Sequence, residues 1–332
     1  MTGYARALAV AVLSFVLGIA GARAEGVGFR DVRVESNGEV MLVAVWYRSD
    51  TPSGRTVEGP FAMKATRNAA LADGRYGLLL FSHGTGGGRL NHRGTAIWLA
   101  QAGYIVAAPE HVGDNWRDDR YSGTADNWSR RPRQLSAVLD RLLGDPEFGP
   151  RIDPARVAAI GHSIGGYGVL ALIGGRADLG ILSRHCTEFR DRDPVFCDHG
   201  KPDGTFQGRL PELTDRRVRA AVAVAPVGVV FGAGAFSGAT APVQIHRLGQ
   251  DRVLRRSWHE DNIMRLMGSR AQLVLHPKAH HYAFIAPFPA VLIDQVGEPA
   301  HDPPGFERRA FLDRIDRQIL NFLNAVMSPD HH

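Results

Sequence analysis

Apolar and polar positions follow two different patterns along the chain. Near the N-terminus, segments 29–34 and 40–47 have strand-like patterns and flank Asn37-Gly38, a dipeptide typical of a tight hairpin turn. From Tyr76 onward, short apolar runs alternate with segments whose apolar residues recur every three or four positions. These patterns predict an antiparallel hairpin followed by repeated strand–helix units.

The repeated units define the expected fold class. Strands are expected at 77–82, 104–108, 157–160, 218–225, 242–248 and 272–276, and helices at 95–102, 134–143, 165–173, 257–267 and 306–326. Parallel strands need crossover helices, so we predict an α/β protein with a mixed, mostly parallel sheet covered by helices on both faces. In such sheets the ligand site lies beyond the carboxyl ends of the strands.

Two stretches break the alternation. Segment 111–131 follows the strand ending near Ala108 and is expected to be irregular. Segment 176–216 is polar, rich in Asp, Pro and Gly, and falls between two strands of the repeating series. We interpret 176–216 as a lid inserted above the site and predict one α/β domain over residues 25–332.

The first 24 residues have the pattern of a secretory signal peptide. Arg6 precedes an apolar run over 8–19, and Ala22-Arg23-Ala24 matches the small-residue pattern of a cleavage site. We expect cleavage after Ala24 and export to the periplasm or the medium. No later stretch is long and apolar enough to span a bilayer, so we expect no stable membrane insertion of the mature chain.

Export changes the interpretation of the two cysteines. Cys186 and Cys197 both lie in the polar insertion and would enter an oxidising compartment, where disulfides persist. We therefore predict a disulfide between them.

Charge excludes one class of partner. The formal net charge of the 332-residue chain is +5, and its Arg residues are dispersed among acids. The densest basic cluster, at 130–133, is short, which indicates a solvated surface and no nucleic-acid partner. The oligomeric state is left open by the sequence.

The strongest chemical signal is the segment 161–165, Gly-His-Ser-Ile-Gly, which matches G-x-S-x-G. An apolar strand precedes it and a helical pattern follows it, as a nucleophile elbow requires. The glycines are needed on steric grounds, and the helix N-terminus favours negative charge beside the serine. We predict Ser163 as a nucleophile.

A second glycine-rich segment predicts the oxyanion hole. Residues 82–88 read Ser-His-Gly-Thr-Gly-Gly-Gly and directly follow a strand. Acyl transfer needs two backbone N–H groups aimed at the tetrahedral oxyanion, and we assign them to Thr85 and to Ile164. A phosphate cradle is disfavoured because no Gly-Lys-Ser/Thr follows.

The acid and the base should follow the serine in the order Ser, Asp, His. Asp251 directly follows the strand 242–248 and is our candidate for the acid. Glu110 also follows a strand and is its rival, whereas Asp261 lies in a helical pattern and is expected to be solvated.

His280 and His281 follow the strand ending near His276 and are the candidates for the base. Adjacent histidines can also bind metal, but their side chains point in different directions and no carboxylate lies at ligand spacing. We therefore expect neither a metal site nor a cofactor.

With these residues in place, the chain resembles the bacterial predicted dienelactone hydrolase group of the α/β-hydrolase superfamily. It is more distantly similar to the plasma-type platelet-activating-factor acetylhydrolases. The matching segments are 81–87 (Phe-Ser-His-Gly-Thr-Gly-Gly), 107–111 (Ala-Ala-Pro-Glu-His), 131–133 (Arg-Pro-Arg), 153–156 (Asp-Pro-Ala-Arg) and 161–167 (Gly-His-Ser-Ile-Gly-Gly-Tyr). The two-cysteine insertion and the segments 211–213 and 219–222 also fit, so the resemblance covers most of 76–284.

The resemblance implies an α/β-hydrolase fold and selects His281 as the base, because an aromatic residue, Tyr282, follows it. The chain differs from these families at two positions, which limits the properties that the resemblance implies. True dienelactone hydrolases have a Cys nucleophile where this chain has Ser163, so their substrate does not carry over. The acetylhydrolases have an acid after the preceding strand, where this chain has Ala225-Pro226, which leaves Asp251 as the candidate.

These observations predict an exported serine esterase that acts on a small-molecule ester through an acyl-enzyme. The same triad could serve an amidase or peptidase, a lactonase or a polyesterase, because leaving-group preference depends on the shape of the pocket. A catalytically inactive binding protein on the same scaffold would require a missing triad member, and none is missing.

Overall fold

The computed structural model describes residues 26–199 and 206–327. The expected signal peptide at 1–24 and a short part of the polar insertion lie outside these ranges. None of the helices in the described ranges combines the length and the apolar character needed to cross a membrane.

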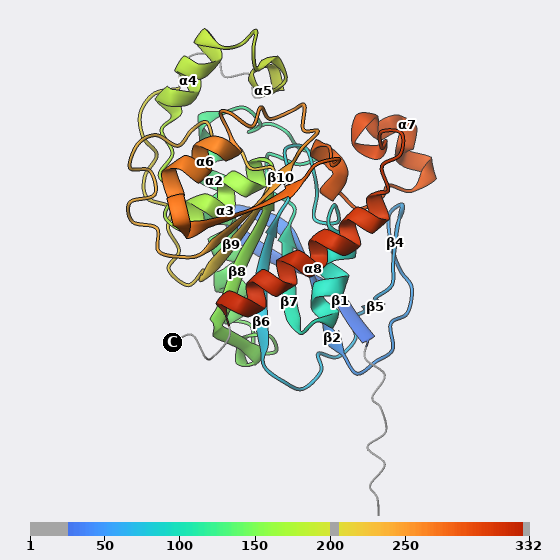
Figure 1. Ribbon diagram of the computed structural model, residues 1–332. Coiled ribbons are helices and arrows are strands. Elements are labelled where there is room, and N and C mark those ends of the chain that lie inside the picture. Colours follow the sequence, from blue (N-terminus) through green and yellow to red (C-terminus); the bar gives the residue numbers. More distant parts are fainter. Residues whose placement is uncertain (1–25, 200–205, 328–332) are drawn as a thin grey trace, which may run out of the picture.

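A nine-stranded sheet forms the centre of the molecule (Figure 1). Its strands, in spatial order, are β11 (Ala271–His276), β10 (Val243–Leu248), β9 (Ala220–Val224), β8 (Ile152–His162), β6 (Tyr76–Ser82), β7 (Tyr104–Pro109), β2 (Glu39–Ser49), β1 (Gly26–Ser36) and β5 (Thr66–Arg67). The block from β11 to β7 is parallel, β2 is antiparallel to both of its neighbours, and β5 pairs in parallel with β1. The predicted fold class is confirmed.

The first two strands form the predicted hairpin. Ser36 pairs with Glu39, and between them Asn37 and Gly38 have φ angles of 54° and 75°. Both angles are positive, as a two-residue turn of type I′ requires, and Asn and Gly adopt them more readily than other residues.

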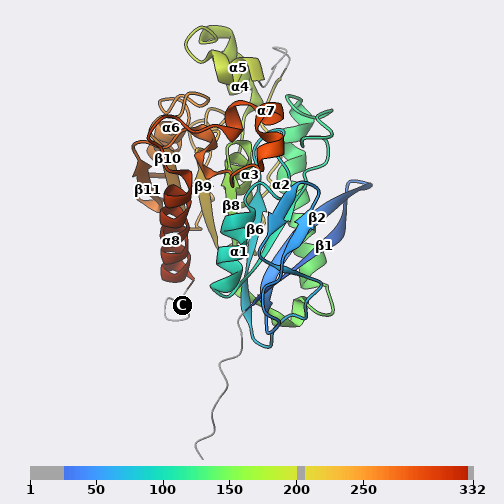
Figure 2. The same cartoon turned by 90° about the vertical axis from the view of Figure 1, so that its right-hand side faces the viewer.

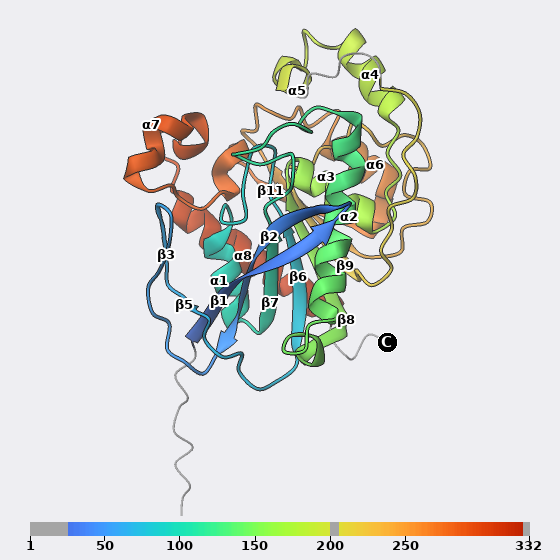
Figure 3. The ribbon, with the colours of Figure 1, turned by 180° about the vertical axis from the view of Figure 1, so that it is seen from behind.

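Eight α-helices surround the sheet in the described ranges. They are α1 (Arg93–Gln101), α2 (Ala125–Leu143), α3 (Ile164–Leu172), α4 (Leu179–Glu188), α5 (Pro194–His199), α6 (Glu260–Met267), α7 (Ile293–Val296) and α8 (Arg308–Val326). Helices α1 and α8 pack on one face of the sheet and α2, α3 and α6 on the other, as Figures 1 and 3 show from opposite sides. Strand β6 contributes side chains to the hydrophobic cores on both faces of the sheet. Leu78 and Leu80 face one core, and Leu79 and Phe81 face the other.

The expectation of an irregular segment over 111–131 is wrong in its last part, because α2 already begins at Ala125. The helix contains Pro132, which cannot donate a hydrogen bond to the carbonyl of Trp128. The Tyr167 hydroxyl of α3 donates to that carbonyl instead, at 2.9 Å. A tertiary contact therefore replaces the missing helical hydrogen bond, and local pattern alone could not reveal it.

The polar insertion folds into α4 and α5 and lies beyond the carboxyl ends of the strands, at the top of Figure 2. A disulfide joins Cys186 in α4 to Cys197 in α5, so the predicted disulfide is confirmed.

Several short elements were not expected from the sequence. They are the two-stranded sheet of β3 (Thr56–Glu58) and β4 (Phe61–Met63), and the 3₁₀ turns η1 (Gly149–Arg151), η2 (Gly268–Arg270), η3 (His281–Phe284), η4 (Ala290–Leu292) and η5 (Glu298–Ala300). Each is too short for a periodic pattern to emerge. The elements η3 and η5 matter for function, because both contribute residues to the pocket described below.

Candidate active site

Ser163 lies at a sharp turn between β8 and α3. Its backbone φ of 58° and ψ of −122° are rarely adopted by a residue other than glycine, and such a conformation costs of order 1–3 kcal/mol. Hydrogen bonds to neighbouring backbone hold the turn in place. The Ser163 N–H donates to the carbonyl of Val224 at 3.0 Å, and the Ser163 carbonyl accepts from the N–H of Val227 at 3.2 Å.

The two glycines of the motif have steric reasons to be there. A Cβ on Gly161 would lie 2.1 Å from the Gly165 carbonyl oxygen, and a Cβ on Gly165 would lie 2.2 Å from the Ser82 carbonyl oxygen. Both distances are far below contact, and both obstacles are backbone atoms. The turn can therefore form only with glycine at these positions, as expected of a nucleophile elbow.

Two side chains far apart in the sequence meet at the same edge of the sheet. The Nδ1 of His281, in η3, lies 2.7 Å from Oδ2 of Asp251, in the loop after β10. The other Asp251 oxygen accepts hydrogen bonds from the N–H groups of Val253 and Leu254, at 2.8 and 2.9 Å. With Nδ1 donating to the carboxylate, the Nε2 of His281 is the nitrogen left to accept a proton.

His162, the residue before the serine, holds the loop that carries His281. The ring of His162 is buried, and its Nε2 donates to the carbonyl of His281 at 2.8 Å. Burial, together with the nearby His281 and His92 rings, lowers the pKa of His162 well below its ordinary value, so the ring stays neutral. The elbow and the candidate base are thus linked directly. Sequence reasoning placed His162 near the site but did not reveal this contact.

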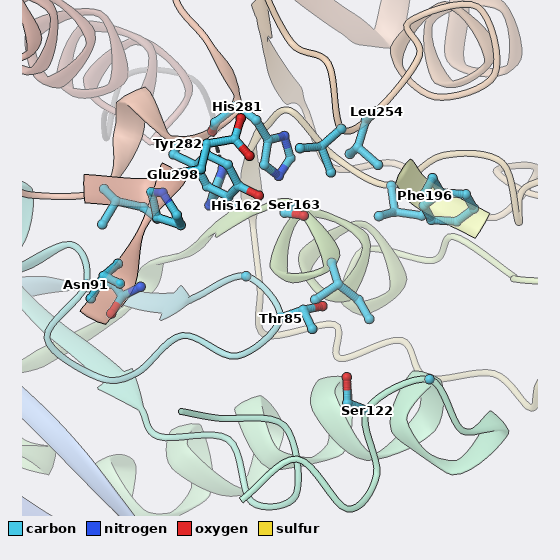
Figure 4. A pocket seen from close by; sticks show the side chains of 18 of the residues that line it. Thr85, Asn91, Ser122, His162, Ser163, Phe196, Leu254, His281, Tyr282 and Glu298 are labelled. Carbon is cyan, nitrogen blue, oxygen red and sulfur yellow. Dashed lines mark hydrogen bonds between the residues drawn. The ribbon is translucent and has the colours of Figure 1, made fainter. Parts of the chain in front are cut away.

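The hydroxyl of Ser163 and the ring of His281 lie beside each other at one pocket (Figure 4). In the described part of the chain the Ser163 hydroxyl forms no hydrogen bond, so it points into the pocket without a protein partner. Hydrogen bonds between a nucleophile and its base are often long in free enzymes and tighten when substrate binds.

The two predicted oxyanion donors lie on either side of the serine. Thr85, in the loop after β6, and Ile164, the first residue of α3, both line the pocket with Ser163. Within the described ranges, neither backbone N–H donates to a protein acceptor. The loop passes close to the elbow, because a Cβ on Gly84 would lie 3.3 Å from the Ser163 Cβ. This arrangement leaves two N–H groups available for an anion at the serine.

A buried ion pair anchors the loop that carries Thr85. Arg131, in α2, and Asp114 are fully buried, and Arg131 Nη1 lies 2.6 Å from Asp114 Oδ2. Arg131 also donates to the carbonyl of His83, and Asp114 Oδ1 accepts from the N–H of Gly86 at 3.2 Å. The loop is therefore held on both sides of Thr85.

Neutral histidines complete this network. The ring of His83 contacts the Gly84 carbonyl at 2.7 Å and accepts from the N–H of His111 at 3.2 Å. Burial lowers the pKa of His83 to about 3, and burial and Arg131 lower that of His111 well below its ordinary value. Burial raises the pKa of Asp114, but Arg131, Asn127 and His83 together outweigh it and lower the pKa below its ordinary value, so Asp114 remains ionised. The segments of the resemblance that hold His83, His111 and Arg131 were the sign of this network in the sequence.

The structure also locates the rejected candidates. Glu110 pairs with Arg89 at 3.3 Å and does not line the pocket. His280 points away, with its Nε2 2.9 Å from Asp302 Oδ1. Asp302 is also held by Arg308 at 2.8 Å, so His280 helps to fasten the segment that includes η5. Asp261 is half-exposed and pairs with Arg247, in line with expectation.

The insertion contributes to the pocket and is tied to the body of the protein. Leu182 from α4 and Phe196 from α5 line the pocket. Asp193, beside α5, lies 3.0 Å from His185 Nε2 and 3.4 Å from His259 Nε2. His259 belongs to the start of α6 and accepts from the N–H of Gly228 at 3.2 Å. Through Asp193 the insertion therefore has a polar contact with the body close to the site.

The cavity around Ser163 has a volume of about 450 Å³. That size suits a small ligand. Within the described ranges, no three His, Cys, Asp or Glu side chains are grouped so that they could hold a metal ion.

Sequence comparisons relate parts of the chain to known protein families and proteins. The sequence model of platelet-activating factor acetylhydrolase, isoform II, matches residues 53–120, and that of the prolyl oligopeptidase family matches residues 91–179. Cutinase est1 of Thermobifida alba is 32% identical over 137 residues, which are 36% of this chain and 43% of that protein. Lipase 1 of Moraxella sp. (strain TA144) is 29% identical over 130 residues, 34% of this chain and 38% of the lipase. The matched region therefore spans less than half the length of these curated relatives.

Solved structures share the fold over nearly the whole chain. A ferulic acid esterase from Streptomyces cinnamoneus superposes with a TM-score of 0.61 at 20% identity, covering 94% of this chain and 92% of the esterase. A dienelactone hydrolase-like promiscuous phosphotriesterase from metagenomic libraries gives a TM-score of 0.54 at 16% identity, covering 91% of this chain and 99% of that one. The protein is an α/β-hydrolase in fold, with sequence similarity to platelet-activating factor acetylhydrolase. The resemblance stated from the motifs is confirmed.

Proposed function

We propose that this protein is a serine hydrolase of carboxylic esters, with Ser163 as nucleophile, His281 as base and Asp251 as the acid that orients it. The observation that carries the proposal is the 2.7 Å contact between His281 and Asp251 at the pocket that holds the elbow serine. The similarity to a cutinase and a lipase supports ester substrates. A strained serine whose side chain faces a pocket has a chemical use that a structural serine would not have.

In the proposed first step, His281 Nε2 takes the Ser163 proton as the serine oxygen attacks the ester carbonyl. Asp251 keeps the ring in the required tautomer and stabilises its charged form. The N–H groups of Thr85 and Ile164 bind the oxyanion of the tetrahedral intermediate. His281 then gives the proton to the alcohol oxygen, the ester C–O bond breaks, and the acyl group remains on Ser163.

In the second step, a water molecule loses its proton to His281 as it attacks the acyl carbonyl. A second tetrahedral intermediate uses the same two N–H groups. Its collapse returns the proton to Ser163 and releases the carboxylic acid, so the enzyme is regenerated without an external oxidant or metal.

Labelling of the serine tests this proposal. A fluorophosphonate should modify the wild type at one site, Ser163, and Ser163→Ala should lose both labelling and hydrolysis of p-nitrophenyl esters. Ser122→Ala is the matched control, because Ser122 lines the same pocket but lies apart from His281 in Figure 4. Full ester hydrolysis by Ser163→Ala, or labelling that moves to Ser122, would overturn the assignment.

A peptidase is the second candidate, because the prolyl oligopeptidase family model matches residues 91–179, which include the elbow. The same triad cleaves amides when the pocket holds an amine leaving group. A p-nitrophenyl ester and a p-nitroanilide of the same acyl group separate the two. We expect no anilide turnover above the Ser163→Ala background, whereas anilide hydrolysis that depends on Ser163 would favour the peptidase.

We further propose that the chain is exported with its first 24 residues removed, leaving residues 25–332 as one hydrolase domain with the insertion at 176–216. The disulfide between Cys186 and Cys197 supports an oxidising compartment. The intact mass of the exported protein should correspond to a chain that begins at Glu25.

A further inference from the structure

The two ends of the cavity around Ser163 differ in chemistry. One end is formed by apolar side chains that are almost fully buried. Leu182 and Phe196 of the insertion are 2% and 9% exposed there, and Val227 and Leu254 of the body are 3% and 2% exposed. Figure 4 shows Phe196 and Leu254 together on one side of Ser163. Because these side chains are shielded from solvent, we call this the closed end.

The opposite end is more open and carries polar groups, although Val296 and Pro299, which are close to Glu298 in the sequence, also line the pocket. Asn91, Tyr282 and Glu298 line it, and Figure 4 shows them on the other side of Ser163. Glu298 is exposed, and its carboxylate has no ion pair or hydrogen bond with the described residues. No other Asp or Glu lines the described pocket. Burial and the charges of Glu298 and Asp251 raise the pKa of Tyr282 to about 12, so its hydroxyl stays neutral.

We infer that the closed end receives the acyl group of the ester and that the open end receives the alcohol, with Glu298 favouring alcohols that carry a positive charge. This inference rests on the proposed function. In acyl transfer the alcohol must leave while the acyl group is still bound to Ser163, so the alcohol belongs at the end that opens to solvent. His281 must reach the alcohol oxygen to return the proton, and Tyr282, its neighbour, lines this end.

The substrate class that follows is the ester of a small apolar acid with an amino or quaternary ammonium alcohol. The step itself is the one described above: the bond from the acyl carbon to the alcohol oxygen breaks, and a bond to Ser163 forms. The alcohol leaves with the proton carried by His281. Glu298 takes no part in the bond changes and acts by attracting the cation.

Two isosteric alcohols test the open end. Choline butyrate and 3,3-dimethylbutyl butyrate have the same shape and differ by one positive charge. We expect kcat/KM of the wild type to favour the choline ester by about fivefold at low ionic strength, the effect of one partly solvated charge at close range. The preference should disappear in Glu298→Gln and decrease with added salt.

Asp294→Asn is the matched control, because Asp294 is an exposed acid of the neighbouring helix α7 that does not line the pocket. It should keep the wild-type ratio. A wild type without a preference for choline would overturn the inference. So would a Glu298→Gln variant that loses activity equally toward both esters, because Glu298 would then act on His281 and not on the alcohol.

Chain length tests the closed end. With p-nitrophenyl esters from acetate to octanoate, Leu182→Ala should move the preferred acyl chain toward longer acids and leave the choline ratio unchanged. Leu182→Val, a milder change, guards against unfolding and should shift the preference in the same direction by less. A shift of acyl preference in Glu298→Gln and not in the Leu182 variants would reverse the two ends and overturn the inference.

These outcomes differ from failure of the proposed function. If Ser163 is labelled and esters are hydrolysed but neither the charge nor the chain-length effect appears, only the subsite inference fails. If Ser163 is not labelled and no ester is hydrolysed, the proposed function fails first.

Discussion

The two flanks of the pocket are stabilised by different kinds of interaction. One flank consists of residues 82–134 and includes the loop that carries Thr85, the oxyanion loop. A fully buried ion pair between Arg131 and Asp114 fixes the backbone of this loop on both sides of Thr85. On the flank that carries Asp251 and His281, the two loops meet through the hydrogen bond between these residues, and the insertion contacts the body through Asp193 and His259. The disulfide lies within the insertion. The two flanks therefore position their groups differently: an ion pair holds the backbone of the oxyanion loop, whereas His281 is oriented by its hydrogen bond to Asp251.

The two flanks also differ in the hydrogen-bond partners of their buried carboxyl groups. Asp114 has three donors in Arg131, Asn127 and the Gly86 N–H. On the other flank, both carboxylate oxygens of Glu260 are buried without a hydrogen-bond partner. Burial and the charge of Asp251 raise the pKa of Glu260 to about 8. One flank therefore contains a carboxylate that is ionised beside its cation, and the other contains an acid that stays protonated at neutral pH.

The largest expected effect is a difference in kcat between variants of two adjacent histidines, His280 and His281, on the flank that carries the proposed base. His281→Ala should lower kcat by about four to six orders of magnitude, because the proposed base is lost. His280→Ala should lower it by at most about tenfold, because His280 contacts Asp302 and only helps to hold the η5 segment. Turnover of a p-nitrophenyl ester near neutral pH measures both. An inactive His280→Ala beside an active His281→Ala would exchange their assignments.

The next effect concerns the stability of the first flank. Arg131→Met should lower the free energy of unfolding by about 3–5 kcal/mol, because Asp114 would remain as a buried charge without its cation. Chemical denaturation measures the loss. Arg133→Met is the control, since Arg133 is exposed in the same helix and its change should stay within about 0.5 kcal/mol. Equal losses in the two variants would show that the buried ion pair contributes no more to the free energy of unfolding than an exposed arginine does.

The disulfide should matter less, and only locally. Replacing Cys186 and Cys197 together by Ser should cost about 2–3 kcal/mol in the chain-entropy picture of a closed loop with a sequence separation of 11. Amide hydrogen exchange should increase in α4 and α5 and remain unchanged in β6 and β8. Loss of protection across the central sheet would mean that the insertion stabilises the whole domain.

The smallest effect is a pH dependence of stability from Glu260. Its pKa in the folded protein is raised, so the folded state keeps a proton that the unfolded chain loses. The contribution of Glu260 to stability should therefore be fully present below about pH 4.5 and should be lost toward pH 8, by at most about 1.4 kcal/mol per pH unit. In Glu260→Gln this slope should be absent, as urea denaturation at several pH values would measure. Glu307→Gln, at an exposed position, should keep the wild-type slope.

Much of the fold could be predicted from the sequence, because the determinants are local. Short continuous apolar runs predicted the central strands, and Asn37-Gly38 predicted the hairpin turn. The elbow was visible because its strained turn excludes a Cβ at Gly161 and Gly165. Helix α2 was misjudged because Pro132 is tolerated only through the hydroxyl of Tyr167.

The features of the site also fall into those that the sequence predicted and those that only the structure revealed. Ser163, Asp251 and His281 were proposed from motif, strand order and resemblance, and the structure places all three at one edge of the sheet. The contact of His162 with the His281 carbonyl spans 119 positions, and the anchoring of the oxyanion loop by Arg131 spans 48. Contacts over such separations leave no periodic trace in a single sequence.

By itself, then, the sequence determined the order of the elements, the glycines of the elbow and the residue types able to perform acyl transfer. Only the tertiary structure decided which charges are buried, which histidine faces the serine, and that Glu298 has no partner among the described residues at the open end of the pocket. The physical reason is that backbone conformation responds to nearest neighbours, whereas burial and electrostatics depend on which distant segments are brought together by packing.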